Sequence, residues 1–155
     1  MWFAIKNMPK NKKSITEEFV ERAIIKYLSQ NEWGTNLQFG SLREKGVDIK
    51  VRHNRYSRYF LIECKGEGRS QNLKSNNSHK EVAFVYSLGQ IITRMKTGGS
   101  TRYYFGLGLP EDSANIALRR LPWQVAKKLL LYVFSVNGKG KVKKYDWQEL
   151  KKHQK

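Results

Sequence analysis

The sequence is short of cysteine, of acidic residues and of long apolar segments, and each shortage excludes a class of protein. Cys64 is the single cysteine among 155 residues, so no intramolecular disulfide forms and no oxidising compartment is required. Three histidines, far apart in the sequence, argue against a structural zinc site. The longest apolar run, Leu129–Phe134, is far too short to cross a bilayer. We therefore expect no membrane partner and a cytoplasmic location.

The deficit of acidic residues leaves a strongly basic chain. Thirteen Asp and Glu stand against thirty Lys and Arg, which gives a formal net charge of +17. Such an excess in a short chain indicates a polyanionic partner, and nucleic acid is the first candidate. The basic residues are spread along the whole chain, which argues against an amphipathic helix lying on an anionic membrane. We expect one domain over residues 14–150, between a basic N-terminal arm (1–13) and a basic tail (151–155).

Hydrophobic periodicity predicts alternating helices and strands. The segment Ser14-Ile15-Thr16-Glu17 fits a capping box with Ser14 as the cap, so a helix should follow to about Gln30. The other expected elements are a strand around 36–39, a hairpin of strands 46–51 and 59–65, a polar loop at 66–79, a helix over 80–96, a strand over 102–109, a helix over 119–136 and a strand over 142–147. This order predicts an α/β domain with a mixed central sheet flanked by helices.

The hairpin carries the residues of greatest chemical interest: Asp48 on its first strand, and Glu63 and Lys65 on its second. Residues two apart on a strand point to the same face, so Glu63 and Lys65 should lie together while Cys64 is buried opposite. Two converging carboxylates repel each other unless a cation neutralises them, and such hard oxygen ligands suit Mg²⁺. The alternative is that Asp48 only begins a strand and that Glu63 and Lys65 form a surface ion pair.

Asp48 followed by Glu63-Cys64-Lys65 resembles the signature of the PD-(D/E)XK superfamily of restriction-endonuclease-like nucleases. The order of expected elements is also similar to the αβββαβ core of that superfamily, here with an added C-terminal helix and strand. The resemblance covers residues 14–136. It departs from the usual pattern at Val47, where many members have proline, and at Arg94, where the glutamine motif usually ends in tyrosine.

The resemblance implies two further site residues. The segment 21–28 is similar to the first helix of archaeal Holliday-junction resolvases, which makes Glu21 the acidic residue that completes the metal site and Glu18 its reserve. Gln90, within 87–92, matches a glutamine that several branches carry in the helix after the Glu-x-Lys strand.

The implied activity is Mg²⁺-dependent hydrolysis of phosphodiester bonds in DNA, with Mn²⁺ able to replace Mg²⁺. Asp48, Glu63, Glu21 and the backbone carbonyl of Cys64 would hold the ion. Lys65 would orient the attacking water or stabilise the developing charge, and Gln90 would hydrogen-bond the lysine, the water or the substrate.

The same resemblance implies a DNA partner, a homodimer with one site per strand, and a prokaryotic, viral or phage origin. Three functions remain open: a restriction-type or other defence or mobile-element endonuclease, a structure-specific nuclease such as a junction resolvase, and a catalytically silent nucleic-acid-binding domain. The residues expected to contact nucleic acid are Arg55, Tyr56, Arg58, Arg69, Lys74, Lys80, Arg94 and Lys96.

Overall fold

The described strands form one mixed five-stranded sheet in the order β1-β2-β3-β4-β5. The structure is a computed structural model, and it describes residues 13–35, 47–68, 73–96 and 99–155. Its elements are α1 (Glu17–Ser29), β1 (Ile49–Arg52), β2 (Arg58–Cys64), α2 (Leu73–Thr93), β3 (Arg102–Pro110), α3 (Glu111–Arg120), α4 (Trp123–Leu129), β4 (Leu131–Val136), β5 (Val142–Tyr145) and α5 (Trp147–His153). The expected α/β class and the flanked mixed sheet are confirmed.

The three central strands, β2, β3 and β4, run parallel, and the outer strands β1 and β5 pair antiparallel with their neighbours. Ile49 pairs with Ile62 in the expected hairpin, and the parallel register places Cys64 beside Gly108. The end of β2, the end of β3 and the start of β1 therefore meet at one end of the sheet.

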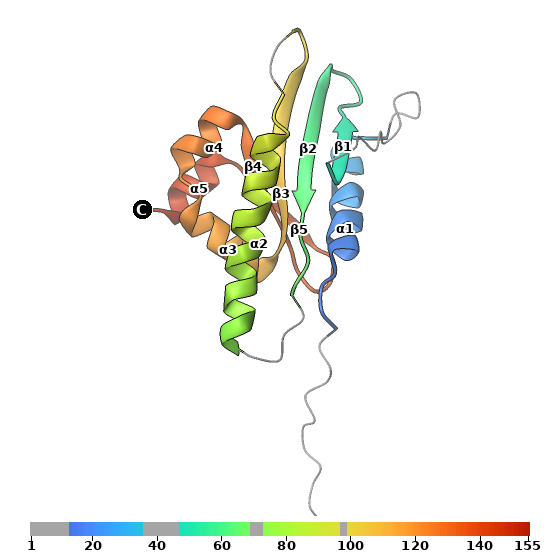
Figure 1. Ribbon diagram of the computed structural model, residues 1–155. Coiled ribbons are helices and arrows are strands. Elements are labelled where there is room, and N and C mark those ends of the chain that lie inside the picture. The colour runs from blue at the N-terminus through green and yellow to red at the C-terminus, as the bar shows by residue number, and fades with distance from the viewer. Residues whose placement is uncertain (1–12, 36–46, 69–72, 97–98) are drawn as a thin grey trace, which may run out of the picture.

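One helix, α1, covers one face of this sheet, and the other helices cover the opposite face (Figure 1). The buried side chains of α1 include Val20 and Ile24, which pack against Phe60, Ile62 and Phe134 of the sheet. These five side chains are at most 2% exposed, so burial of this apolar stripe fixes α1 on the sheet.

The helices on the opposite face pack against the alternate side chains of the same strands. Leu61 and Leu107 are fully buried there, beneath Ile91 of α2, Leu118 of α3 and Leu150 of α5. Side-chain alternation along β2 therefore places Leu61, and with it Glu63, toward α2, as expected.

Two expectations about helix starts need correction. Thr16, not Ser14, caps α1, because its hydroxyl oxygen accepts a hydrogen bond from the backbone N–H of Phe19 at 3.1 Å. The helix expected over 80–96 begins earlier, at Leu73, within the segment expected to be a loop. Polar composition led to that loop assignment, but polar residues also form helical turns.

The helix expected over 119–136 is confirmed only for the part that forms α4. The segment begins in the last turn of α3, continues through α4 and ends in a strand, β4. Leu130 ends α4 in the left-handed conformation, with φ 54° and ψ 47°, and the chain then enters the sheet. The run 129–134 is apolar throughout because β4 is covered on both faces, and such a run has no periodicity to distinguish a strand from a helix.

The basic tail expected at 151–155 is also wrong for its first three residues, which belong to α5. Asp146 caps this helix by accepting from the N–H of Glu149 at 2.9 Å. Beyond the helix, the Gln154 amide donates to the carbonyls of Leu118 and Leu121 at 3.0 and 2.6 Å, which fastens α5 to α3.

The strand expected around 36–39 lies outside the described residues. None of the described helices is long and apolar enough to span a membrane.

Candidate metal centre

Asp48 immediately precedes β1 at the end of the sheet where β2 finishes. Its Oδ2 accepts a hydrogen bond from the backbone N–H of Cys64 at 2.7 Å, which ties the start of β1 to the end of β2. Continuing the register from the Ile49–Ile62 pair places Asp48 opposite Glu63. The hairpin therefore brings together the two carboxylates that the sequence predicted as metal ligands.

Glu63 is 3% exposed, although it is ionisable. Burial raises the pKa of Glu63 to about 8, and the charge of Asp48 together with a hydrogen bond to it contributes to this rise. The positive charges of Lys65 and Arg94 act in the opposite direction. At neutral pH without a cation, Glu63 therefore keeps its proton, and a cation bound here would have to displace it.

Two glutamates of α1 approach Asp48 from the other side. The carboxylate oxygens of Glu17, Glu21 and Asp48 all lie within 4.8 Å of one another, close enough to share one metal ion. Glu17 and Glu21 are one helical turn apart and so lie on the same side of α1. Glu18 does not join them, because it is exposed and forms an ion pair with Arg22 at 2.6 Å. The reserve assignment to Glu18 is therefore wrong.

The thiol of Cys64 is affected by the charges of all these acidic groups. Burial raises its pKa well above the ordinary value, and the negative charges of Asp48, Glu21, Glu17 and Glu63 raise it further. The charges of these four carboxylates, from three separate chain segments, therefore all act on the Cys64 thiol. We call Glu17, Glu21, Asp48 and Glu63 the carboxylate cluster.

The start of α1 is held at the end of β2 by close backbone contacts. The N–H of Glu67 donates to the carbonyl of Ile15 at 2.7 Å, and the N–H of Ile15 donates to the carboxylate of Glu67 at 3.0 Å. Gly66 lies so close that a Cβ atom there would be 2.4 Å from the backbone nitrogen of Glu17. Glycine is therefore required at position 66. The close approach of Gly66 to the start of α1 holds Glu17 and Glu21 near Asp48.

Glu17 was missed from the sequence as a site residue, because it was assigned to the capping box. Its spacing of four from Glu21 was the available signal, since both had to share one side of a helix. Which helix face reaches the hairpin depends on the Ile15–Glu67 contact, and no local pattern reveals that contact.

Lys65 lies two residues after Glu63. Gln90 of α2 is four residues from both Tyr86 and Arg94, so these three residues share one side of the helix. The Nζ atom of Lys65 is 4.7 Å from the ring centroid of Tyr86, which steadies the ammonium group next to Glu63. The Oε1 atom of Gln90 and the Oε1 atom of Glu63 are both buried without a hydrogen-bond donor among the described residues. Buried acceptors without a donor are costly, so both oxygens are suited to a cation or a substrate group.

An open groove of about 420 Å³ runs past this end of the sheet. Its wall includes Glu17, Lys65, Gly68, His79 and Tyr86, which brings α1, the end of β2 and α2 to one surface. His79 packs against Gly68, where a Cβ atom would approach the imidazole to 2.7 Å. No pattern in the sequence associates His79 with the carboxylates.

The residues expected to contact nucleic acid do not form one group. Arg55, Tyr56 and Arg58 lie at the turn between β1 and β2, at the other end of these strands from Asp48 and Cys64. Residues of a hairpin turn are separated from the ends of its strands by the length of those strands, so these three residues lie away from the carboxylates.

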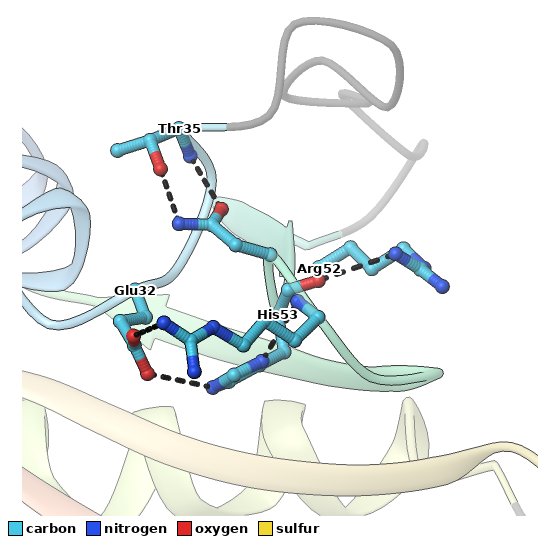
Figure 2. A network of polar contacts seen from close by, with 6 residues as sticks. Glu32, Thr35, Arg52 and His53 are labelled. Carbon is cyan, nitrogen blue, oxygen red and sulfur yellow. Dashed lines mark hydrogen bonds and ion pairs between the residues drawn. The ribbon is translucent and has the colours of Figure 1, made fainter.

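The hairpin turn has its own polar network (Figure 2). Glu32 binds Arg55 at 3.1 Å and lies 3.8 Å from the Nε2 atom of His53. The backbone N–H of Arg55 donates to Nδ1 of His53 at 3.1 Å, and burial lowers the pKa of this histidine. Arg58 lies over the ring of Tyr56, 4.9 Å from its centroid. These cations therefore stabilise the turn.

The other expected contacts lie in different places relative to the carboxylates. Arg94 lies near enough to Glu63 to lower its pKa, and Lys96 lines a hollow beyond the end of α2. Lys80 forms an ion pair with Asp112 at 3.3 Å. Arg69 and the side chain of Lys74 lie outside the described residues.

No family model, curated protein or solved structure matches this chain, so the site is interpreted from its own geometry.

Proposed function

We propose that this chain is a divalent-metal-dependent endonuclease that hydrolyses phosphodiester bonds in DNA. The observation that carries the proposal is the approach of Glu17 and Glu21 to Asp48, which lies opposite Glu63. Glu63 is buried near Lys65, and one of its oxygens lacks a donor among the described residues. A purely structural cluster would be expected to satisfy that oxygen, because an unpaired buried acceptor destabilises the fold by about 1–3 kcal/mol.

The donor set fits a hard divalent cation. Asp48, Glu21 and Glu17, whose carboxylate oxygens lie within 4.8 Å of one another, would hold Mg²⁺ or Mn²⁺. Glu63, opposite Asp48, and the backbone carbonyl of Cys64 would be the further ligands on the hairpin. When bound, such an ion polarises the scissile phosphate and makes a bound water more acidic. Oxygen ligands and the separation of the histidines both favour this class of ion over zinc.

The chain's own residues then have separate tasks. The ammonium group of Lys65 acts on Glu63 and can orient the attacking water or stabilise charge on the phosphate. The unpaired Oε1 of Gln90 can accept a hydrogen bond from that water or from Lys65. Arg94 adds a second positive charge near Glu63 and can contact a substrate phosphate.

DNA is the proposed substrate because the chain carries a formal net charge of +17. Neutralisation of phosphates by such a chain supplies affinity without reading the sequence. A homodimer is proposed as well, since two symmetric sites are the simplest means of cutting both strands.

The test is cleavage of linear duplex, single-stranded and four-way-junction DNA in Mg²⁺, in Mn²⁺ and in EDTA. Asp48→Asn and Glu21→Gln should each lose more activity than the roughly 10–100-fold that outer-shell partners of metals contribute. Glu18→Gln is the matched control on α1 and should cleave like the wild type, because Glu18 pairs with Arg22 away from the cluster.

Cleavage that persists in EDTA, or that is equal in the wild type and Asp48→Asn, would contradict the proposal. Discrete fragments from plasmid DNA would identify a restriction-type enzyme, and paired nicks at a junction would identify a resolvase. DNA binding without cleavage of any substrate in either metal would identify a silent binding domain.

A further inference from the structure

Helix α2 carries large apolar side chains on two opposite sides. On its inner side, Phe84 and Ile91 are at most 3% exposed and belong to the core beneath the sheet. On its outer side, four side chains are between 47 and 59% exposed: Val82, Val85, Tyr86 and Ile92. A helix that is apolar all round is normally covered all round, whereas the described residues cover α2 on one side only. The outer side of α2 therefore indicates a partner.

The outer side of α2 also lacks charge. The segment 82–93 contains no Lys, Arg, His, Asp or Glu, although charged residues make up 28% of the chain. Exposed sides of surface helices are normally charged or polar. A nucleic-acid backbone is bound by cations, and a helix that lies on an anionic membrane carries Lys and Arg beside its apolar side. A neutral protein surface is therefore the occupant that this side fits.

Gly89 forms a gap in the middle of this outer side. It lies three residues after Tyr86 and three before Ile92, and a Cβ atom at Gly89 would meet no other atom within 4 Å. Glycine inside an exposed helix costs about 1 kcal/mol relative to alanine, but it lets another helix approach closely. Near the gap, Val82, Val85 and Tyr86 line a hollow of about 390 Å³. We call Val82, Val85, Tyr86, Gly89 and Ile92 the α2 stripe.

The α2 stripe is complementary to itself when two copies of the helix pack antiparallel. In a two-fold symmetric dimer each contact occurs twice, with the two residues exchanged between the copies. When the axis passes between positions 86 and 89, three pairs lie opposite each other: Tyr86 with Gly89, Val82 with Thr93, and Val85 with Ile92. The largest side chain of each stripe then fills the gap in the other stripe, and the segment 82–93 brings no charges together.

The dimensions of the stripe determine how strong such a contact is. The segment 82–93 spans about 18 Å along the helix, at about 1.5 Å per residue. A single helix face of this length is smaller than the roughly 800 Å² that each partner buries in a standard stable complex. Two chains of net charge +17 also repel each other outside the stripe. The expected dimer is therefore reversible, and it should become tighter when salt screens the repulsion.

From these observations we propose that the α2 stripe binds the α2 stripe of a second copy of this chain. The inference rests on the proposed nuclease function, whose homodimer it assigns to one surface. Tyr86 joins this surface to the candidate metal centre, since its ring lies over Lys65 and it lines the groove beside Glu17. The dimer therefore covers Tyr86 in both copies and brings the two grooves to the same interface.

Sedimentation equilibrium without DNA or metal measures self-association between about 1 µM and about 1 mM of chain. Two variants each place one charge on the stripe, Val85→Glu and Ile92→Lys. Each should raise the dimer Kd at least about ten-fold, because the new charge is buried against apolar side chains of the other copy. The matched controls are Val125→Glu of α4 and Ile25→Lys of α1, which make the same changes at exposed positions on other helices and should keep the wild-type Kd.

An equimolar mixture of Val85→Glu and Ile92→Lys tests the antiparallel pairing. In the mixed dimer the introduced carboxylate of one chain faces the introduced ammonium group of the other. The mixture should therefore associate at least about ten-fold more tightly than either variant alone. Higher salt should tighten the wild-type dimer, whereas it weakens binding to DNA.

A wild type that stays monomeric over the whole concentration range would overturn the inference, and so would a mixture that associates no better than the separate variants. Thermal melting at the lowest concentration checks that each variant folds. A large loss of melting temperature in Val85→Glu but not in Val125→Glu would show that the stripe is covered within one chain, which would also overturn the inference.

The outcomes for the interface and for the nuclease are separable. If the wild type cleaves DNA and remains a monomer, only the interface fails. If the chains associate as expected and no DNA is cleaved in Mg²⁺ or Mn²⁺, the nuclease proposal fails and the interface stands.

Discussion

Replacement of Glu63 by glutamine tests the electrostatics of the carboxylate cluster without assuming any activity. Glutamine keeps the shape of the side chain but cannot ionise. In the wild type without metal, folded Glu63 holds its proton up to a pKa of about 8, whereas the unfolded chain releases it near 4.5. Between these values the folded state binds one more proton, so the free energy of unfolding must fall as the pH rises.

The size of this effect follows from the same interval. Each pH unit between 4.5 and about 8 lowers the free energy of unfolding of the metal-free wild type by about 1.36 kcal/mol. Over the whole interval the loss is at most roughly 5 kcal/mol. Glu63→Gln should match the wild type near pH 4.5 and exceed it in stability by up to several kcal/mol at pH 8. The difference should stay constant above pH 8, because no further proton is released from Glu63.

A divalent cation should make the wild type more stable than Glu63→Gln. Mg²⁺ or Mn²⁺ binds the ionised wild-type cluster and stabilises it, whereas Glu63→Gln lacks one ligand charge and should gain much less. Urea unfolding followed by tryptophan fluorescence, at a series of pH values with EDTA or with metal, measures both effects. Glu18→Gln is the control, since its exposed carboxylate should change stability by only a few tenths of a kcal/mol.

Two results would refute this reasoning. A stability difference between Glu63→Gln and the wild type that does not change from pH 4.5 to 8 would contradict the raised pKa of Glu63. Equal stabilisation of both proteins by metal would show that Glu63 is not a ligand.

Three further predictions use the same unfolding measurement. Gly66→Ala should lower the free energy of unfolding by about 1–3 kcal/mol, because its Cβ meets the backbone of Glu17. Gly89→Ala, which has open space around its Cβ, should raise the free energy of unfolding by about 0.5–1 kcal/mol. Equal effects of the two substitutions would contradict the close packing at Gly66. Gln90→Leu should stabilise the metal-free protein by about 1–2 kcal/mol, because it removes a buried acceptor without a donor among the described residues. The same substitution should slow cleavage. Destabilisation by Gln90→Leu would mean that the Gln90 oxygen accepts a hydrogen bond in the folded protein. Burial lowers the pKa of His53, so the unfolded chain takes up the proton first as the pH falls through 6.5 and the wild type should lose stability there. His53→Gln should not show this loss. Parallel curves of stability against pH for the two proteins would contradict the lowered pKa of His53.

The hairpin and the face of Glu63 could be predicted because strand alternation alone determines them. Asp48, Glu63 and Lys65 were chosen from spacing, and the structure places Asp48 and Glu63 opposite each other. Helix α1 was also predictable, because a strong apolar stripe follows a capping residue, although the cap is Thr16.

Other features depend on contacts between distant segments. The role of Glu17 requires the start of α1 to meet Gly66, which lies about fifty residues away in the chain. Strand β4 is apolar on both faces, so its sequence has no period to identify it. Arg55 was expected near the carboxylates from its position in the chain, but Glu32 holds it at the far turn.

The two hydrogen bonds between Ile15 and Glu67 hold α1 against the end of β2, and breaking them would separate the carboxylates of α1 from those of the hairpin. Glu17 and Glu21 belong to α1, whereas Asp48 and Glu63 belong to the hairpin, so release of α1 would leave two half-sites on separate parts of the fold. Local opening of α1 and assembly of the site are then one equilibrium. Hydrogen exchange at the amide of Val20, which donates to Thr16 at 3.1 Å, should slow when a cation joins the two halves.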